Sequence, residues 1–466
     1  MKKQLIALAL SLSILTYNSI TSVAAPENSN PIETNEIPNW PVGPTINSEA
    51  AFLLEANTGV VLYSKNMNKH LYPASTTKIM TVLLASENSK RDDIVKFSYD
   101  AVFSLDPGSS NIGIDPGQAM PMEECMYGIM VGSANEVSNA VAEHVGGSIE
   151  GFVEMMNQRA SDLGLKDTHF MNANGLPNKE HYTSAHDLAY IAKEYFSNEY
   201  ISKIGNTPNH HFIATSTQPD DFYIRNKHKL INGDIKYEGI KGGKTGYTTE
   251  ANETLVTCAE RDGMKLICVV LNADSPYQFT DTVDLFDYGF NNFQVSNLSA
   301  NEVRYSIKSN NIFPTSVDIL GNSRQILDLN SSDYIIMPKN ITFDDVETKV
   351  TFDSSDENTV AKIEYSYHGA YLGYGTINRV TKSKNVSAFD ASLSQVEEEK
   401  KVNENEPIFI NIIDVANYIV IIAFGLILIS FIISFLINYN LLDNIKSKNR
   451  IRKRRRSSRG SGNLKF

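Results

Sequence analysis

The chain has 466 residues, of which 42% are hydrophobic and 21% charged, and its formal net charge is −12 at pH 7. This length and apolar content exclude a chain that is disordered throughout, and they favour two domains with additional segments. The acidic balance argues against nucleic acid as a partner of the main body, because acidic surfaces repel a phosphate backbone.

Both ends of the chain carry signals for export and membrane insertion. Residues 1–25 have a basic start, an apolar run and small residues before a cleavage point after Ala25, which predicts a signal peptide. An uncleaved anchor is the alternative, although the apolar run is about half of the ~20 residues that span a bilayer. Residues 418–437 contain no charged side chain and predict one transmembrane helix.

The residues after this helix, 438–466, form a basic tail that predicts the orientation of the protein. Ten Lys and Arg and no acid lie between positions 446 and 466, and such clusters stay on the cytoplasmic side of a membrane. We therefore expect a single-pass protein of the cell membrane, with its main body outside and its C-terminus inside. Nucleic-acid binding is an alternative for a basic run, but the adjacent span explains it more simply.

In chain order, residues 26–44 predict a leader strand or a loose linker, and the stretch 51–64 predicts a hairpin that turns at Asn57-Thr58-Gly59. Apolar periodicity then predicts a mainly helical region between about 75 and 200, followed by strands and a last helix. The expected helices are 76–88, 122–131, 136–145, 149–163, 185–196 and 280–288, and the expected strands begin at 240, 253 and 265.

These elements predict an α/β (α+β) domain over residues 45–293, in which an antiparallel sheet is made of both chain ends and a helical insert lies between them. Short alternating stretches predict a small all-β domain over residues 298–380. Residues 381–417 are polar at first and predict a second linker, which leads to the membrane helix.

The cysteines are Cys125, Cys258 and Cys268, an odd number without a Cys-x-x-Cys pair or a His placed to complete a metal site. Buried free thiols and a bridge between Cys258 and Cys268 are the two interpretations. No metal and no cofactor is expected.

The first candidate for chemistry is the stretch Pro73-Ala74-Ser75-Thr76-Thr77-Lys78. If Ser75 opens a helix, Lys78 lies on the same face and its amine reaches the Ser75 hydroxyl, while the helix N-terminus offers free N–H groups to an oxyanion. Taken alone, Ser-x-x-Lys is common by chance, and Ser75 also fits the role of a helix cap.

Two further groups follow. Ser133-Ala134-Asn135 lies between two helical patterns, where Ser133 and Asn135 can both face a cleft, although a turn is the plainer interpretation. Lys244-Thr245-Gly246-Tyr247 starts a strand pattern, and its glycines allow a substrate backbone to approach closely. A phosphate-binding loop is the alternative here, but the strand–loop–helix context of such loops is absent.

The three groups occur in the order Ser-x-x-Lys, Ser-x-Asn, Lys-Thr-Gly, which is a specific combination. The chain resembles penicillin-recognising serine enzymes, and among them the low-molecular-mass penicillin-binding proteins that are D-alanyl-D-alanine carboxypeptidases (peptidase family S11). The stretches YPASTTKIMT, LGLKDTHFMNANGLPNKEHYTSAHDLA and EGIKGGKTGYTTEAN carry the same likeness, which covers residues 45–293 and more loosely 298–380.

The resemblance implies the following roles. Ser75 attacks the carbonyl between the two terminal D-alanines of a peptidoglycan stem peptide, Lys78 is its base, and Ser133 relays a proton to the leaving amine. Asn135 holds the substrate amide, the N–H groups of Ser75 and Tyr247 bind the oxyanion, and the Lys244-Thr245-Gly246 strand binds the peptide and its carboxylate. Penicillins are the implied inhibitors, because they mimic the dipeptide.

Two departures from the family pattern limit this transfer. Glu136 stands where the family usually has Asp, and the stretch NADSPYQFTDT lacks an Arg with which many members help to bind the carboxylate. A class A β-lactamase is disfavoured, because residues 165–180 contain no Glu-x-x-x-Asn motif. Endopeptidase or transpeptidase activity uses the same residues, so it remains open, whereas a catalytically silent sensor of the wall or of β-lactams is expected to have lost one of the motifs.

Overall fold

The computed structural model describes residues 34–105, 108–302, 316–317, 323–324, 327–352 and 358–379. The chain divides into two units at residues 381 and 382, and all described residues belong to the first unit. Among them, no helix combines the length and the apolar character needed to cross a bilayer. The predicted signal peptide and the predicted span 418–437 lie outside the described residues.

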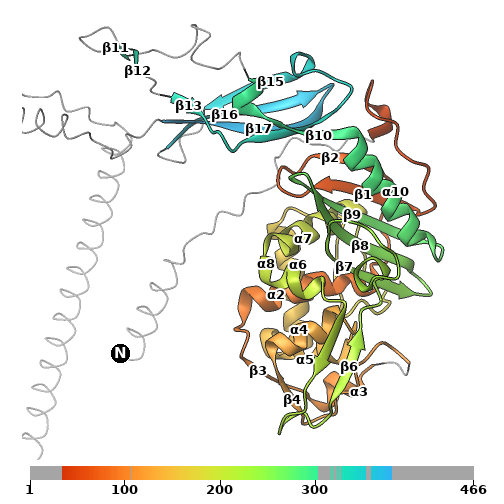
Figure 1. The fold of residues 1–466 in the computed structure, drawn as a ribbon. Helices are drawn as coiled ribbons and strands as arrows, with labels where there is room; N and C mark the ends of the chain where they lie inside the picture. Colours follow the sequence, from red (N-terminus) through yellow and green to blue (C-terminus); the bar gives the residue numbers. More distant parts are fainter. Residues whose placement is uncertain are drawn as a thin grey trace, which may run out of the picture. The chain divides into compact units, whose positions relative to one another are not determined.

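A five-stranded antiparallel sheet forms the centre of the larger domain, with the strand order β2-β1-β9-β8-β7 (Figure 1). The strands are β1 (Ala50–Glu55), β2 (Val61–Lys65), β7 (Ile240–Thr248), β8 (Asn252–Arg261) and β9 (Met264–Ala273). The N-terminal hairpin pairs with β9 through β1 and so joins the three later strands in one sheet, which confirms the predicted sheet of both chain ends. Among the described residues, no strand pairs with the outer edge of β7, and such an edge can pair with another chain.

Helices of the insert cover one face of this sheet, and α10 (Tyr277–Asn292) covers the other (Figure 1). The expected helices are observed with shifts of a few residues at their ends, and α10 begins three residues earlier than predicted. The helices of the insert are α2 (Lys78–Asn88), α3 (Tyr99–Phe103), α4 (Met122–Met130), α5 (Asn135–Gly146), α6 (Ile149–Asp162), α7 (Ala185–Ser197), α8 (Glu199–Gly205) and α9 (Lys229–Asn232). The short helices α3, α8 and α9 and the two-stranded ribbons β3–β4 (Ile94–Lys96, Ala119–Pro121) and β5–β6 (Asn209–Phe212, Phe222–Arg225) were not predicted.

Because helices cover both faces of the sheet, successive strand residues enter two different cores. Phe52 packs with the helical insert, whereas Leu53 packs with α10. The same alternation separates two thiols, because Cys258 faces the first core and Cys268 the second. All three cysteines are buried and free, which overturns the alternative of a Cys258–Cys268 bridge.

The segment before β1 differs from the loose linker predicted for residues 26–44. From the 3-10 turn η2 (Thr34–Glu36) onward, it packs beside β2. The Trp40 side chain is only 6% exposed, and its indole N–H donates to the Leu62 carbonyl at 3.0 Å. The contact was not predicted, because the segment is mostly polar and has no apolar periodicity. A single large apolar side chain is nevertheless enough to dock it.

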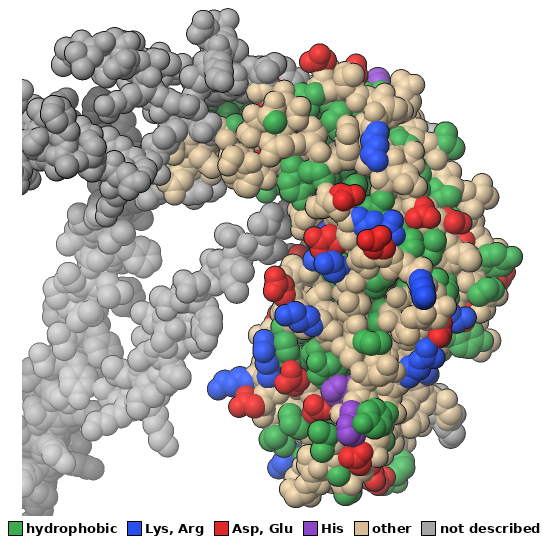
Figure 2. All heavy atoms as spheres, in the orientation of Figure 1, with side chains coloured by type: hydrophobic (Ala, Val, Ile, Leu, Met, Phe, Trp, Pro, Cys, Tyr) green, Lys and Arg blue, Asp and Glu red, His purple; other side chains and the backbone are tan. Residues whose placement is uncertain are grey.

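The β-rich domain follows α10 through β10 (Phe293–Asn297) and the short helix α11 (Leu298–Asn301). β10 pairs with β14 (Tyr334–Pro338), and a four-stranded sheet has the order β13-β17-β16-β15. Its strands are β13 (Leu327–Leu329), β15 (Glu347–Phe352), β16 (Thr359–Tyr367) and β17 (Ala370–Arg379); β11 (Ser316–Val317) and β12 (Ser323–Arg324) form a separate pair, and η5 (Phe343–Asp345) is a 3-10 turn. On the face shown in Figure 2, acidic and basic side chains of the described residues lie interspersed.

The burial of Trp40 leads to a test of the docked N-terminal segment. We expect Trp40→Ala to lower the free energy of unfolding by about 3–5 kcal/mol, because it removes a large buried side chain. Val42→Ala is the matched control, since Val42 is 90% exposed, and it should change stability by less than about 0.5 kcal/mol. Urea unfolding followed by circular dichroism measures both variants, and equal stabilities would disprove the docking.

Candidate active site

Ser75 lies in a short 3-10 turn, η3 (Ala74–Thr77), that leads directly into α2. The Thr76 hydroxyl donates to the Pro73 carbonyl at 2.6 Å and fixes this turn, and Ala74 adopts a positive φ of 49°. The α-helix therefore begins at Lys78, two residues later than the sequence predicted. The tighter turn still places the Lys78 Nζ atom 3.0 Å from the Ser75 Oγ atom.

The Lys78 amine is fully buried and lies among three oxygen atoms. Besides Ser75 Oγ, these are the side-chain oxygen of Asn135, at 2.6 Å, and the backbone carbonyl of Asn174, also at 2.6 Å. Asn135 is the first residue of α5, so the predicted Ser-x-Asn group does meet the Ser-x-x-Lys group. Asn174 was not among the predicted site residues.

Ser133 and Lys244 form the second contact between the predicted groups. Lys244 Nζ donates to Ser133 Oγ at 3.0 Å, which joins the helical insert to strand β7. Lys244 is 2% exposed and Ser133 is 5% exposed, and Ser133 has a φ of 59° that turns the chain just before α5. Thr245 follows on β7 and is partly buried.

Gly246 brings strand β7 against the turn that carries Ser75. A Cβ atom at this position would lie 2.9 Å from the Ser75 nitrogen and 2.3 Å from the Thr254 hydroxyl oxygen, so only glycine allows this approach. The backbone of Tyr247 comes next in the strand, while its side chain is 63% exposed. Strand β7 therefore lies against the backbone nitrogen of Ser75, and an oxyanion site between the N–H groups of Ser75 and Tyr247 stays a prediction.

Burial and neighbouring charge shift the pKa values of both lysines downward. The pKa of Lys78 lies well below its usual value, first because of burial and then because of the charge of Lys244, while Glu136 acts in the opposite direction. Burial, together with the charge of Lys227, lowers the pKa of Lys244 to about 7. Both shifts favour the neutral amine over the ammonium form.

Glu136, the residue that departs from the family pattern, is buried at the start of α5. Burial raises the pKa of its carboxyl group. One carboxyl oxygen accepts the Ile112 N–H at 2.7 Å, and the Asn135 N–H donates to the Ser110 carbonyl at 2.8 Å. Glu136 thus holds the 110–114 loop beside the site.

The segment Asn172–Leu176 forms a further wall of the site. Gly175 has a φ of 87°, and a Cβ atom there would lie 1.8 Å from the Ala74 carbonyl oxygen. His181, farther along this region, bonds the Thr77 hydroxyl through Nε2 at 2.9 Å and accepts the Met171 N–H through Nδ1. Burial lowers the pKa of His181 to about 3, so its ring is a neutral support for the turn.

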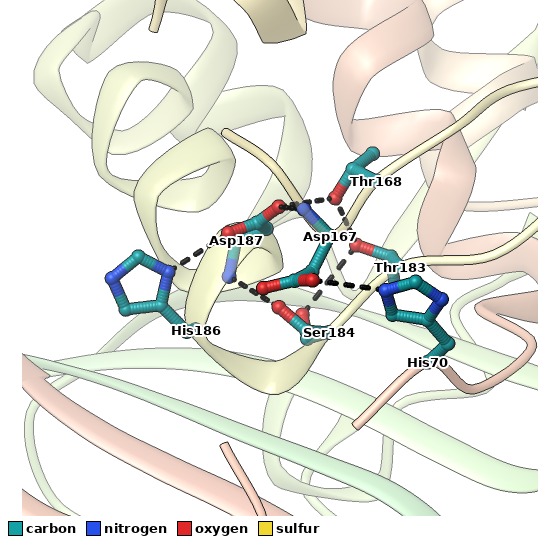
Figure 3. Close-up of polar contacts among 7 residues, drawn as sticks. All are labelled: His70, Asp167, Thr168, Thr183, Ser184, His186 and Asp187. Atoms are coloured by element: carbon teal, nitrogen blue, oxygen red, sulfur yellow. Dashed lines mark hydrogen bonds and ion pairs between the residues drawn. The ribbon is translucent and has the colours of Figure 1, made fainter. Parts of the chain in front are cut away.

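A polar cluster at the start of α7 anchors the region that contains this wall (Figure 3). Asp187 accepts the Asp167 N–H at 2.8 Å and the Thr168 hydroxyl at 3.0 Å, and it pairs with His186. The Ser184 hydroxyl caps the helix by accepting the Asp187 N–H at 3.1 Å. Although the cluster combines Ser, His and Asp, its hydroxyls and carboxylate fix backbone, and we assign it a structural role.

Lys227 is the cation that sequence reasoning missed. It is exposed beside the site, its Nζ atom lies 3.4 Å from the Ser110 hydroxyl oxygen, and its charge contributes to the lowered pKa values of Lys78 and Lys244. The neighbouring His228 is buried, with Nε2 2.9 Å from the Thr257 hydroxyl oxygen, and so ties this segment to the sheet. In the sequence, Lys-His-Lys at 227–229 looks like an ordinary solvated run, so only its position in the fold identifies it.

The geometry includes no metal cluster: within the described parts of the chain, no group of three or more His, Cys, Asp or Glu could hold a metal ion. Known proteins resemble this chain. The sequence profile of the D-alanyl-D-alanine carboxypeptidase family, peptidase family S11, matches residues 37–275, which is just over half of the chain. The chain belongs to this family.

Curated relatives in this family are carboxypeptidases by name. D-alanyl-D-alanine carboxypeptidase DacF of Bacillus subtilis is 39% identical over 253 residues, a match that covers 53% of this chain and 63% of the relative. DacA of Escherichia coli is 31% identical over 266 residues, covering 54% and 63%. The match thus spans slightly less than two thirds of the length of these relatives.

Solved structures of penicillin-recognising proteins share the fold. The DD-transpeptidase of a Streptomyces strain has a TM-score of 0.51 and 27% identity, covering 54% of this chain and 99% of that protein. Penicillin-binding protein 5 of Haemophilus influenzae has a TM-score of 0.58 at 24% identity, covering 73% and 98%. The likeness to penicillin-binding protein 5 concerns the fold alone. It covers 73% of this chain, more than residues 37–275 account for, so it extends into the β-rich domain.

The approach of Gly175 to Ala74 can be tested against another left-handed glycine. Gly147 has a φ of 75° and open space around its Cα atom, so Gly147→Ala should cost only the conformational penalty of about 1 kcal/mol. Gly175→Ala adds a steric overlap and should cost about 3 kcal/mol or more. Thermal and urea unfolding measure the difference, and two equal costs would contradict the close packing of segment 172–176 on the Ser75 turn.

Proposed function

We propose that this protein is a serine D-Ala-D-Ala carboxypeptidase that removes the terminal D-alanine from peptidoglycan stem pentapeptides through an acyl-enzyme on Ser75. The observation that carries the proposal is the position of Lys78 Nζ, 3.0 Å from Ser75 Oγ and 2.6 Å from each of two other oxygens. A serine hydroxyl is a weak nucleophile, and a buried amine with a lowered pKa is the base it requires.

The contacts of Lys78 define the proton transfer. A neutral amine has two N–H bonds and one lone pair. If Asn135 and the Asn174 carbonyl accept the two N–H bonds, the lone pair points to Ser75 and accepts its hydroxyl proton. Ser75 Oγ then attacks the carbonyl carbon between the two D-alanines, and the backbone N–H groups of Ser75 and Tyr247 stabilise the resulting oxyanion.

Departure of D-alanine requires a proton on its amine. We assign Ser133, whose hydroxyl contacts Lys244 at 3.0 Å, to relay this proton. Its hydroxyl gives a proton to the amine and takes up the proton that Lys78 removed from Ser75, so that Lys78 is neutral again. The C–N bond breaks, D-alanine leaves and an ester remains on Ser75. Water then attacks this ester with Lys78 as the base, and the free Ser75 is regenerated.

Lys227 offers an answer to the missing Arg of the family pattern. The terminal carboxylate of the substrate would be bound by Lys244 and Thr245 on β7, with Lys227 as a second cation. The support for this role is electrostatic, since Lys227 lowers the pKa of Lys244 and therefore acts on the same region of space. Lysine meets a carboxylate as a point charge, whereas arginine would bind it through two parallel hydrogen bonds.

The location of the reaction is also part of the proposal. The signal sequence predicted for residues 1–25 and the span predicted for 418–437 support an exported catalytic domain that is attached to the cell membrane and faces the wall. Penicillins should acylate Ser75, because their ring amide occupies the place of the D-Ala-D-Ala bond. The proposed reaction uses no cofactor, and its partners are the stem peptide and the membrane.

Ser75→Ala tests the proposed nucleophile. The wild-type chain should release D-alanine from a stem pentapeptide and bind a fluorescent penicillin covalently, and the variant should do neither. An assay for free D-alanine and gel fluorescence measure the two activities, and cross-linked dimer peptides as substrate or product separate carboxypeptidase from endopeptidase and transpeptidase activity. A Ser75→Ala protein that still acts would refute the mechanism.

Lys227→Ala tests the second cation. We expect KM for the pentapeptide to rise about tenfold with a smaller change in kcat, because a charge that binds the carboxylate equally in the ground and transition states mainly affects binding. Lys229→Ala is the control, since Lys229 is an exposed neighbour that lies over the Phe279 ring. Steady-state kinetics decide the matter, and similar KM values in the two variants would remove Lys227 from the carboxylate site.

A further inference from the structure

We propose that Asn139 and Thr81 are positioning residues for the reaction, because they hold the segment Asn172–Leu176 so that its Asn174 carbonyl fixes the direction of the Lys78 lone pair. This inference rests on the proposed function. It assigns a role to two buried polar side chains that do not contact Ser75 and that none of the three sequence motifs contains.

Helix α5 holds Lys78 both directly and through the segment. Asn135 and Asn139 are one turn apart and therefore lie on the same face of the helix. Asn135 contacts the Lys78 amine itself. The Asn139 side-chain oxygen accepts the Asn174 side-chain N–H at 3.0 Å, and its own N–H donates to the Ala101 carbonyl at 3.3 Å.

Helix α2 holds the segment from the other direction. Thr81 follows Lys78 by three residues on the same face, and its hydroxyl donates to the Ala173 carbonyl at 2.6 Å. The carbonyls of Ala173 and Asn174 thus both meet side chains of α2. Thr81 is fully buried, and Asn139 and Asn174 are each 3% exposed, so bulk water does not compete for these hydrogen bonds.

Bonds within the segment fix its shape. The Asn172 side-chain oxygen accepts the Gly175 N–H at 2.7 Å, and the Asn174 side-chain oxygen accepts the Leu176 N–H at 3.0 Å. These bonds form an Asx-type turn. Its own contacts set its curvature, while Asn139 and Thr81 set its position relative to Lys78.

The direction of the lone pair depends on that position. An amine rotates freely about its Cε–Nζ bond unless acceptors hold its N–H groups. With both oxygen acceptors in place, Ser75 is the direction left for the lone pair, and with the Asn174 carbonyl displaced the amine samples other rotations. The loss then falls on the rate of proton transfer rather than on binding of the substrate carboxylate, which involves β7 on another side of the site.

The charges around Lys78 determine the sign of any change with pH. The groups that face it are Lys244 on β7, Glu136 on α5 and Lys227 before α9, while the neutral His181 ring lies behind Thr77. A carbonyl acceptor stabilises the ammonium form of Lys78 more than the amine form. Displacement of the Asn174 carbonyl therefore lowers the pKa of Lys78, and a new carboxylate nearby raises it.

The test uses the full-length chain in detergent, with benzylpenicillin as the probe, and measures the acylation rate constant and the preceding binding constant between pH 5 and 9. For Asn139→Ala we expect the plateau of the pH–rate profile to be about tenfold lower and the binding constant to be unchanged. The acidic limb of the profile, where the rate falls as Lys78 is protonated, should lie at lower pH. Asn139→Asp keeps an acceptor for Asn174 and adds a charge, so its acidic limb should move to higher pH.

A second pair of variants separates position from stability. Thr81→Val preserves the shape of the side chain without its hydroxyl and should slow acylation about fivefold. Thr81→Ser restores the hydroxyl and should return the rate to within about twofold of wild type. Asn88→Ala is the control, because the Asn88 side chain donates to the Leu84 carbonyl at the far end of α2, and it should leave the rate and the pH profile unchanged.

Two results would overturn the inference. One is a folded Asn139→Ala protein with the wild-type plateau and acidic limb, and the other is a Thr81→Ser protein as slow as Thr81→Val. The failure of the proposed function looks different, because a wild-type chain that benzylpenicillin does not acylate at Ser75 would remove the reaction itself. If benzylpenicillin acylates the wild type and the Asn139 and Thr81 variants alike, only the positioning role of these two residues is disproved.

Discussion

The site depends on one constraint, the burial of the Lys78 amine. Placing a charged ammonium group in a protein interior is costly, so the group is driven towards its neutral form unless oxygens surround it. Here three oxygens surround it, and each comes from a different part of the chain: the η3 turn, the first residue of α5 and the Asn172–Leu176 segment. The same burial that weakens the ammonium form also holds these three parts together, because each supplies an oxygen within hydrogen-bond distance of the amine. The contacts that lower or raise the pKa of Lys78 are therefore the same contacts that hold the site together.

The sheet supplies the other half of the site by leaving one edge free. The N-terminal hairpin occupies one side of β9, β8 occupies the other, and β7 is left as an outer strand beside the Ser75 turn. Gly246 allows the closest approach between the two, and Gly243 leaves space for the buried His228 ring. α10 packs on the face of the sheet opposite the helical insert, and one apolar cluster continues from Phe286 of α10 to Ile335 and Ile363 of the β-rich domain.

The sequence predicted what depends on local pattern and on motif order. Alternation and apolar periodicity were enough for β1, β8, β9 and the longer helices. The three motifs supplied eight predicted site residues, among which the structure brings Lys78 to Ser75 and Asn135, and Lys244 to Ser133. Contacts between distant parts of the chain were missed. Lys227 reads as a solvated lysine until His228 is seen to hold its segment against the sheet, and Trp40 reads as part of a polar linker until β2 is beside it. Asn139 and Thr81 lie one helical turn beyond motif residues, so their spacing could have raised the question, but only the fold shows the segment that they share.

Under the proposed function, the cations of the site also explain how Lys78 can be neutral before the reaction and basic during it. In the empty site, burial and then the charges of Lys244 and Lys227 hold the pKa of Lys78 down, which favours the amine that accepts a proton. A substrate carboxylate bound between these cations would offset their repulsion, so the pKa of Lys78 would rise when the site is filled. The same contact would favour the protonated form of Lys244, whose pKa is about 7 in the empty site. The base therefore gains strength when a substrate with a free C-terminal carboxylate is present, and this coupling favours terminal D-alanine over an internal peptide bond without any additional recognition residue.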